Sequence, residues 1–331
     1  MKVAVFSTKP YDKVYFEKYN QDSQHQIEFF ETSLNSQTTN LTDGFEVVIP
    51  FVNDTLDENV IIKLSENKVR MIALRCAGFN NVDIGAAERY GIKVTRVPAY
   101  SPQAVAEHAL ALILTLNRKT HKAYNRVKEG NFSLNNLIGF NLHGKTVGVV
   151  GTGTIGSVFC EVMLGLGCKV VAYDVKEQIQ LKNKGVTYLS LEELYKVSDI
   201  ISLHCPLVSA TKHLINNESI SKMKDNVMLI NTSRGGLVHT EDVIKSLKDK
   251  KLGYVGIDVY EQEENLFFED KSEQIIEDDT LIRLISFPNV LITAHQAFLT
   301  KEALKEIAQT VLQNIDDFEH GRKLVNEVSS R

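Results

Sequence analysis

Short apolar runs alternate with amphipathic stretches along most of the chain. In its first part, runs rich in β-branched side chains predict strands at 3–6, 47–51, 71–75 and 93–97. Helical patterns fall between them, at 59–64 and 82–90. Strands that alternate with helices indicate a parallel sheet covered on both faces. We therefore expect an α/β domain here.

The same alternation returns after residue 145. Strands are predicted at 147–150, 169–173, 200–203, 227–230, 254–257 and 290–293. Helices are predicted at 218–224 and 241–250, and Ser190 to Glu193 forms a capping box that opens another. These units predict a second parallel sheet. From Thr300 a long amphipathic helix runs to Gly321, and we expect it to pack back on the first domain.

A helix between the two sheets begins where Ser101 can cap it and Pro102 can occupy its first position. Residues 104–116 are apolar nearly all round, which predicts a helix buried on every side. We expect it to lie at a subunit interface. Residues 117–128 are polar and basic, and we expect them to continue the helix into solvent.

A glycine-rich turn joins the strand at 147–150 to the next helix. Gly151, Gly153 and Gly156 form a G-x-G-x-x-G that follows a strand, opens a helix at Ile155 and precedes a strand ending on Asp174. Gly151 allows the tight turn, Gly153 lets a pyrophosphate approach the backbone, and Gly156 lets helix and strand pack closely. Asp174 can accept hydrogen bonds from both ribose hydroxyls, and it would repel a 2′-phosphate. The motif predicts an NAD site.

Composition narrows the class of protein. A chain of 331 residues with 43% apolar residues predicts two domains with substantial cores. A net charge of −5 argues against nucleic acid and anionic membrane as partners, and no apolar run could span a bilayer. The first residues do not resemble a signal peptide, and the four cysteines have no metal-binding spacing. We expect a cytoplasmic protein with reduced thiols.

Polar residues follow the other predicted strands of the second sheet: Cys205, Pro206, Thr232, Ser233, Arg234, Asp258 and His295. Ligands of open α/β sheets bind at the carboxyl ends of strands, so we expect these residues to meet. His295 ends a buried strand and could relay a proton, with His204 as its rival. Arg234 could bind a carboxylate bidentately, or form a surface ion pair. Glu261, Glu263 and Glu264 are equal candidates for the partner of the histidine.

The first domain has its own candidate residues. The loop from Arg75 to Asn81 follows a strand and opens a helix, and the backbone N–H groups of Ala77 and Gly78 could hold a small anion. An ordinary turn would look the same. Phe51 ends a strand and Tyr100 lies at the crossing between domains, so both rings are candidates to face a substrate.

Five motifs together resemble the D-specific 2-hydroxyacid dehydrogenases, and among them the fermentative D-lactate dehydrogenases of bacteria. The motifs are VVGTGTIG, SLHCPL, NTSRGGLV, GIDVYEQE and TAHQAFLT, and the resemblance extends over the whole chain. It implies a catalytic Arg234, Glu263 and His295, which favours Glu263 over Glu261 and Glu264. It also implies substrate contacts from Ala77, Gly78, Phe51, Tyr100, Arg234 and Phe298. Cofactor contacts are implied at Gly151, Gly153, Ile155, Gly156, Asp174, Cys205, Pro206, Thr232, Ser233 and Asp258.

The resemblance also implies the fold. We expect two doubly wound parallel-sheet α/β domains, which are a Rossmann NAD-binding domain at 100–298 and a flavodoxin-like substrate domain at 1–99 and 299–331. Gln296 after His295, and a longer loop at 265–279, depart from many relatives and bear on substrate choice.

The expected activity is the reversible reduction of pyruvate to D-lactate with NADH, without a metal, by a homodimer or homotetramer. A bulkier 2-oxo acid as substrate is the close alternative. A corepressor-type binding protein is the distant one, because such proteins retain this fold.

Overall fold

The computed structural model describes residues 1–21, 23–263 and 266–330. The chain divides into two compact units, unit 1 (1–101 and 298–331) and unit 2 (102–297). Each contains one parallel sheet with helices on both faces, so the predicted α/β class with two doubly wound sheets is confirmed. Among the described residues, no helix combines the length and the apolar composition that crossing a bilayer requires.

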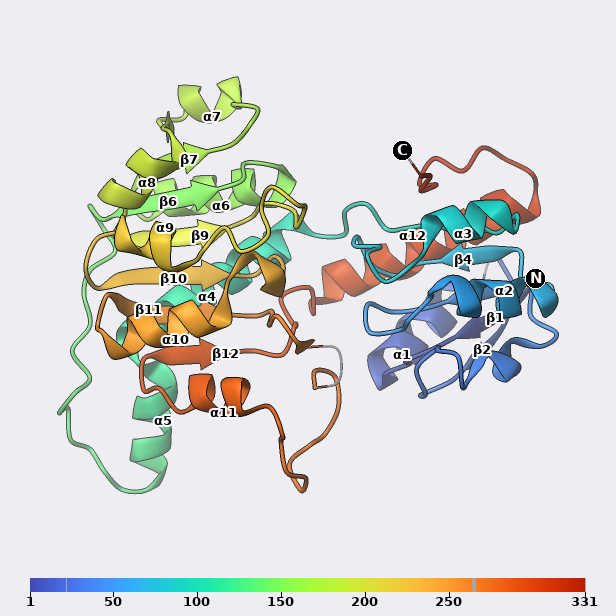
Figure 1. Ribbon diagram of the computed structural model, residues 1–331, viewed down its shortest axis with the longest axis horizontal. Coiled ribbons are helices and arrows are strands. Elements are labelled where there is room, and N and C mark those ends of the chain that lie inside the picture. The colour runs from blue at the N-terminus through green and yellow to red at the C-terminus, as the bar shows by residue number, and fades with distance from the viewer. Residues whose placement is uncertain (22, 264–265, 331) are drawn as a thin grey trace. The chain divides into compact units, whose positions relative to one another are not determined.

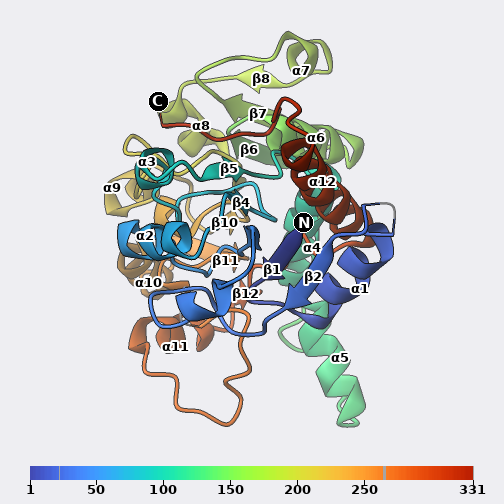
Figure 2. The same cartoon turned by 90° about the vertical axis from the view of Figure 1, so that its right-hand side faces the viewer.

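Unit 1 is built on a five-stranded parallel sheet of order β2-β1-β3-β4-β5, the flavodoxin-like order. Its strands are β1 (Lys2–Val5), β2 (Gln26–Phe29), β3 (Val47–Ile49), β4 (Met71–Ala73) and β5 (Lys93–Thr95). Figure 2 shows α2 (Glu58–Glu66) and α3 (Ile84–Arg89) on one face of the sheet, and α1 (Pro10–Tyr19) and α12 (Lys301–Glu319) on the other. A 3-10 turn, η1 (Thr39–Thr42), precedes β3.

The long C-terminal helix α12 belongs to unit 1 although it follows unit 2 in sequence. It begins where Thr300 caps it by accepting a hydrogen bond from the N–H of Ala303, as the sequence pattern predicts. Its apolar stripe packs on α1 and β4.

Unit 2 has a seven-stranded parallel sheet of order β12-β11-β10-β9-β6-β7-β8. The strand order reverses beside β6. This strand is the first of the sheet along the chain, and it pairs with β9, the fourth, as in a Rossmann sheet. The strands are β6 (Thr146–Val150), β7 (Lys169–Tyr173), β8 (Thr187–Tyr188), β9 (Ile200–Leu203), β10 (Val227–Asn231), β11 (Leu252–Ile257) and β12 (Val290–Ile292).

Helices cover both faces of this sheet (Figure 1). One face packs on α4 (Pro102–Arg118) and α6 (Thr154–Gly165). The other face packs on α8 (Leu191–Val197), α9 (Asn217–Ser221), α10 (Thr240–Lys248) and α11 (Asp279–Ile285). Unit 2 also has α5 (Thr120–Lys128), α7 (Ile179–Asn183) and the 3-10 turn η2 (Gly235–Leu237). The strands are buried on both faces, which explains their continuous apolar runs.

In unit 2, α4 packs one side on β10 and β11, while Glu107, Ala111 and Leu114 are exposed in the single chain. Burial of this helix on every side therefore stays a prediction, because it requires the expected subunit interface. The prediction that the basic stretch continues the helix is wrong. Lys119 takes a left-handed conformation with φ of 52°, which ends α4 and starts α5 in a new direction.

Several elements lack a clear sequence signal. The sequence pattern does not predict β2, because Gln26 and Glu28 alternate with partly exposed apolar residues at its edge position. It also misses α1, whose weakly amphipathic sequence buries only Asp12 and Phe16. Tertiary contacts rather than local pattern stabilise these elements.

Candidate active site

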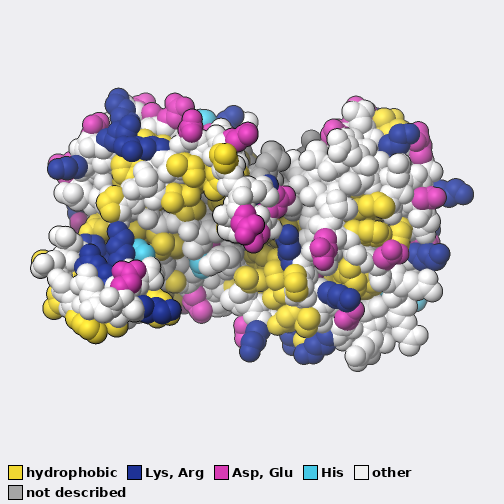
Figure 3. Space-filling model, turned by 90° about the horizontal axis from the view of Figure 1, so that it is seen from below, with side chains coloured by type: hydrophobic (Ala, Val, Ile, Leu, Met, Phe, Trp, Pro, Cys, Tyr) yellow, Lys and Arg dark blue, Asp and Glu magenta, His cyan; other side chains and the backbone are white. Residues whose placement is uncertain are grey.

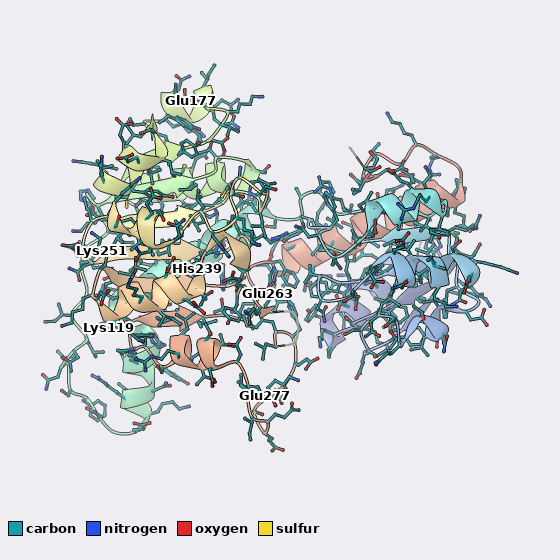
Figure 4. The ribbon with its side chains drawn as sticks, viewed as in Figure 1. Lys119, Glu177, His239, Lys251, Glu263 and Glu277 are labelled. Carbon is teal, nitrogen blue, oxygen red and sulfur yellow. The ribbon has the colours of Figure 1, made fainter. Side chains whose placement is uncertain are left out.

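The strands of unit 2 bring the predicted polar residues to one edge of the sheet. Because β10, β11 and β12 are parallel neighbours, the residues after them follow one another across that edge. Arg234 follows β10, Asp258 follows β11 and His295 follows β12. Figure 4 shows Glu263 at the side of unit 2 where the strands end. Ligands of open α/β sheets bind at this edge.

The glycine motif has the geometry of a phosphate-binding turn. Gly151 has φ of +93°, and a Cβ there would lie 2.7 Å from the backbone nitrogen of Cys205. A Cβ at Gly156 would lie 2.0 Å from the carbonyl oxygen of Gly151, so only glycine lets α6 pack this closely on the turn. Gly153, the N-cap of α6, faces open space, since nothing lies within 4 Å of a Cβ built there. The helix N-terminus beside Ile155 therefore has room for an anionic group.

Asp174 stands at the end of β7 and is held by the glycine turn. Its Oδ2 accepts a hydrogen bond from the N–H of Thr152 at 2.6 Å, and its Oδ1 accepts one from the N–H of Lys176 at 2.9 Å. These bonds fix the carboxylate next to the start of α6. They also show that Asp174 has a structural contribution in addition to any contact with a ribose.

Two further loops approach the same edge. Ser233 donates from Oγ to the carbonyl of Leu203 at 3.0 Å, which ties the loop after β10 to the loop containing Cys205 and Pro206. Burial raises the pKa of Cys205 to about 11, so its thiol stays protonated near neutral pH. Within the described residues, the buried Oγ1 of Thr232 has no hydrogen-bond partner. An unpartnered buried hydroxyl at the same edge of the sheet as the glycine turn fits a bound polar cofactor.

His295 and Glu263 form a close pair. Nδ1 of His295 lies 2.8 Å from Oε1 of Glu263, and Oε2 of Glu263 accepts the N–H of Tyr260 at 2.8 Å. His295 has φ of 50°, an uncommon backbone conformation for a residue other than glycine. Because Nδ1 faces the carboxylate, Nε2 is the nitrogen available to a substrate. The ring of Phe268 lies 5.8 Å from the imidazole, centroid to centroid.

Asp258 fixes the loop that carries His295. Its side chain is fully buried, and its carboxylate accepts the N–H groups of Gln296 and Ala297, both at 2.9 Å. Its own carbonyl accepts the N–H of His295 at 2.7 Å. The hydroxyl of Thr293 donates to the same carboxylate. Asp258 therefore sets the backbone conformation of His295.

Arg234 lies in a turn packed against the loop that follows β11. A Cβ at the neighbouring Gly235 would come within 2.1 Å of the backbone of Tyr260, so these loops can approach only through glycine. Asn231 donates from Nδ2 to the carbonyl of Arg234 at 2.8 Å, and Arg234 donates from Nη1 to the carbonyl of Ser233 at 2.6 Å. The other N–H groups of the guanidinium can receive an anion.

The remaining candidates of unit 2 occupy other environments. Glu261 lies 2.5 Å from Nε2 of His213 and accepts the hydroxyl of Thr240 at 3.0 Å, so it braces a different loop. Glu264 lies outside the described residues. His204 packs on Phe159 with ring centroids 4.8 Å apart, and burial lowers its pKa to about 3. An imidazole that stays neutral cannot donate the proton, so the rival histidine is a core residue.

In unit 1 the loop at 75–81, the candidate anion site, accepts hydrogen bonds at its backbone carbonyls. Arg96 donates from Nη1 to the carbonyl of Ala77 at 2.9 Å, and the thiol of Cys76 donates to the carbonyl of Gly78 at 3.2 Å. Within residues 1–21, 23–263 and 266–330, no acceptor is found for the N–H of Ala77 or Gly78. These two donors are therefore available to a small anion.

Aromatic rings of unit 1 gather around Phe298. The centroids of Phe51, Tyr100 and Tyr11 lie 6.0, 6.4 and 6.5 Å from that of Phe298. The guanidinium of Arg75 stacks on Phe51 at 4.1 Å and donates to the carbonyls of Phe6 and Ser7. This buried arginine holds the ring of Phe51 in place. The sequence pattern predicted neither the contact of Tyr11 with Phe298 nor the stacking of Arg75 on Phe51. The only sequence signal for that stacking is a charged residue at the end of an apolar strand.

One set of side chains in the described part of the chain could hold a metal ion: His25, Asp316 and Glu319. In unit 1, Nε2 of His25 lies 3.1 Å from Asp316, and the N-terminal amine lies 3.2 Å from Glu319. His25 precedes β2, so this set lies at the amino edge of its sheet. It is an ion-pair network apart from the residues described above.

Comparison with known families agrees with this geometry. A family model described as "D-isomer specific 2-hydroxyacid dehydrogenase, NAD binding domain" matches residues 110–297, more than half of the chain. The D-lactate dehydrogenase of Escherichia coli K12 is 48% identical over 328 residues, which are 99% of this chain and 100% of that protein.

Two solved structures resemble the whole chain. The apo-structure of D-lactate dehydrogenase from Escherichia coli has a TM-score of 0.92 and 45% identity, and it covers 99% of this chain and 100% of that one. The pyruvate reductase of Chlamydomonas reinhardtii has a TM-score of 0.93 and 45% identity, with 98% of each chain covered. Both units therefore have counterparts in these proteins.

Proposed function

The chain belongs to the D-isomer specific 2-hydroxyacid dehydrogenase family, and we propose that it reduces pyruvate reversibly to D-lactate with NADH. The pairing of His295 with Glu263 at the carboxyl edge of an NAD-binding sheet carries this proposal. In a dehydrogenase, a carboxylate next to an imidazole helps the imidazole to donate a proton to the substrate oxygen and to take it back. The similar proteins named D-lactate dehydrogenase support pyruvate as the substrate.

Each residue then has one task. The glycine turn receives the pyrophosphate and Asp174 receives the adenosine ribose. Bound NADH supplies the hydride that reduces the keto carbon. Nε2 of His295 donates a proton to the oxygen of that carbon, while Glu263 stabilises the imidazolium through Nδ1. In the reverse direction the neutral imidazole takes the proton back.

Each unit has its own candidate groups for substrate binding. Arg234 binds the carboxylate and polarises the adjacent carbonyl. In unit 1 the N–H groups of Ala77 and Gly78 are the candidates for binding a carboxylate, and Phe51, Tyr100 and Phe298 are the candidates for contact with a methyl group. The assignment of 1–99 with 299–331 to substrate binding, and of 100–298 to NAD, rests on these roles. The arginine and the imidazolium supply the polarisation, so the mechanism assigns no task to a metal.

A single assay tests the proposal. NADH oxidation is followed at neutral pH with pyruvate and with a series of longer 2-oxo acids, and the product is analysed for its stereochemistry. We expect the highest kcat/KM with pyruvate, and D-lactate as the product. A higher value with a branched or aromatic 2-oxo acid would assign the enzyme to that substrate instead.

Cofactor choice should depend on the charge of Asp174. We expect NADH to be used much better than NADPH, because a 2′-phosphate would meet this carboxylate. Asp174→Asn removes the charge, and its single carbonyl oxygen can keep one of the two hydrogen bonds from the N–H groups of Thr152 and Lys176. Like charges 4 Å apart repel by about 1 kcal/mol in water and about 4 kcal/mol near a protein surface, so the preference should narrow by about tenfold or more. Equal kcat/KM for both cofactors in the unaltered enzyme would contradict the assignment.

Substrate size should depend on Phe51. Phe51→Leu enlarges the space beside Phe298 and should raise activity on longer 2-oxo acids relative to pyruvate. One methylene is worth about 1–3 kcal/mol in such a pocket. Phe16→Leu is the matched control, because Phe16 is a buried residue of α1, and the relative rates should not change in it. If both variants leave the series unchanged, Phe51 only fills the core.

Activity should depend on the charge of Glu263. Glu263→Gln keeps the size of the side chain but removes the charge next to Nδ1 of His295. A hydrogen bond to a charged group contributes about 1.5–3 kcal/mol, so kcat/KM for pyruvate should fall roughly tenfold to a hundredfold. Glu261→Gln is the control, since Glu261 contacts His213 and Thr240, and it should leave kcat/KM within about twofold. A loss in the control and none in Glu263→Gln would contradict the assignment.

We further propose a cytoplasmic homodimer or homotetramer. After α5, the segment 129–141 carries apolar side chains that solvent reaches in the single chain. Phe132, Leu134 and Ile138 are 75%, 80% and 84% exposed, and Tyr124 of α5 is 62% exposed. Several large apolar side chains exposed within one short segment are typical of subunit contacts. Sedimentation equilibrium of Leu134→Ser beside the unaltered protein tests this assignment, and a monomer in both would contradict it.

A further inference from the structure

A chain of hydrogen bonds leads from helix α4 to the loop that carries His295. Nε2 of His108, a residue of α4, lies 3.0 Å from the hydroxyl oxygen of Thr293 and 3.3 Å from Oδ1 of Asp258. Thr293 is the first residue after β12, and Asp258 is the first residue after β11. All of these residues belong to unit 2. A polar side chain of α4 therefore reaches the edge of the sheet where the proposed chemistry takes place.

The carboxylate of Asp258 is unusual because solvent does not reach it. On the face drawn in Figure 3, Asp and Glu side chains project from the surface, as acidic side chains usually do. Asp258, in contrast, is 0% exposed. Within the described residues, His108 is the only basic side chain at ion-pair distance from its carboxylate. A buried carboxylate needs hydrogen bonds to offset its lost hydration, so His108 contributes to that compensation.

The direction of these hydrogen bonds follows from the single proton of the Thr293 hydroxyl. This hydroxyl lies within hydrogen-bonding distance of both Asp258 and His108. An ionised carboxylate only accepts hydrogen bonds, so the hydroxyl proton points to Asp258. The hydroxyl oxygen can then only accept from His108, and Nε2 of His108 must carry a proton. The chain therefore runs from His108 through Thr293 to Asp258.

The same carboxylate holds the backbone on which His295 stands. It accepts the N–H groups of Gln296 and Ala297. The carbonyl of Asp258 accepts the N–H of His295, whose φ of 50° is sparsely populated and needs support from its surroundings. A rotation of the Asp258 carboxylate would therefore move the imidazole of His295.

We propose that His108 is a positioning residue of the active site. It donates from Nε2 to Thr293 and so fixes the carboxylate of Asp258, which in turn fixes the loop of His295. The inference rests on the proposed role of His295 as the proton donor. His108 itself takes no part in the proton transfer.

His108→Leu tests the proposal, because it removes the donor at a helix position that leucine suits. NADH-binding sites are counted by fluorescence titration, and kcat is expressed per site. We expect kcat for pyruvate reduction to fall roughly tenfold, since misplacing a reacting group by about 1 Å can cost about a hundredfold. The Kd of NADH should change by less than about twofold, because the glycine turn belongs to another strand. An unchanged kcat overturns the proposal.

His108→Gln is the matched conservative variant. The amide nitrogen of glutamine can take the place of Nε2 and donate to Thr293, so this variant should recover most of the lost kcat. A purely structural role would not make kcat depend on the donor, and a glutamine variant as slow as the leucine variant contradicts the proposal. The control is His143→Leu, which removes an exposed histidine before β6, at the opposite edge of the sheet, and should leave kcat unchanged.

Thr293→Val tests the middle of the chain, because it keeps the shape of the side chain and removes the linking hydroxyl. It should lower kcat about as much as His108→Leu. The protein with both changes should lose little more than either variant, since contacting residues of one network are not additive. If the two losses multiply, the residues act separately and the chain is refuted. Should His108→Leu fail to fold, Thr293→Ser beside Thr293→Val replaces it, and equal kcat in these two refutes the chain as well.

The proton on Nε2 can be observed without an assay of activity. ¹⁵N NMR of the histidine side chains distinguishes the two neutral tautomers, and the signals of His108 are those absent from His108→Gln. We expect a protonated Nε2, and a bare Nε2 overturns the proposal. Failure of the unaltered protein to oxidise NADH with any 2-oxo acid would instead contradict the proposed function, and the tautomer would still decide whether the chain exists.

Discussion

Replacing His295 with Asn should reduce kcat/KM for pyruvate by about 10²–10⁴-fold, the usual contribution of a general acid. Asparagine tolerates the positive φ of 50° found at this position, so the loop should keep its conformation. The amide can fill part of the space beside Glu263, but it cannot donate a proton at neutral pH. The loss should appear in both directions of the reaction.

Two measurements separate this chemical effect from a structural one. NADH binding, followed by fluorescence, should change little in His295→Asn, because the glycine turn and Asp174 belong to other strands. Thermal stability should also be retained, since Asp258 still receives the N–H groups of Gln296 and Ala297. A loss of activity below about tenfold would remove His295 from the mechanism.

Alanine at the two glycines of the cofactor turn should weaken NADH binding in both cases but lower the Tm in only one. In Gly156→Ala the new Cβ would lie 2.0 Å from the carbonyl oxygen of Gly151, so α6 must move away from the turn. Overpacking of this kind costs about 1–3 kcal/mol and sometimes more. In a domain of this size each kcal/mol lowers Tm by about 2–4 °C. Gly156→Ala should therefore lose both several degrees of Tm and NADH affinity.

Gly153→Ala is the matched partner of that variant. Its Cβ would meet nothing within 4 Å, and its φ of −64° suits alanine. The Tm should hardly change, but the methyl group would stand where the pyrophosphate approaches the backbone. Affinity for NADH should fall by about 1–3 kcal/mol, which is roughly fivefold to 150-fold. Unchanged NADH affinity in Gly153→Ala would mean that the pyrophosphate lies elsewhere.

Much of the site follows from the sequence because its signals are local. A G-x-G-x-x-G between a strand and a helix specifies its own backbone, and an acid at the next strand end is the basis for the proposed ribose contact. The sequence also places Arg234, Asp258 and His295 after predicted strands. Because neighbouring parallel strands end at one edge, such positions predict proximity without any coordinates.

Pairings between side chains could not be predicted in this way. Three glutamates within four positions of one loop are equivalent in the sequence, and only the course of the backbone directs Glu263 to His295 and Glu261 to His213. The same holds for the stacking of Arg75 on Phe51, which joins two strands of unit 1. In the sequence, His204 and His295 both follow predicted strands and are equivalent candidates. Only the tertiary structure shows that His204 is buried beside Phe159.

Periodicity, glycine spacing and β-branched runs by themselves determined the two α/β sheets, the cofactor turn and the edge that carries the chemistry, since each depends on residues close together in the chain. Tertiary structure alone decided the break of the connecting helix at Lys119, where a left-handed residue redirects the chain. It also placed Lys119, Lys122, Arg126 and Lys145 around one cavity, which no motif marks. The physical reason is that charge density and burial depend on which distant segments pack together, and local pattern does not record this.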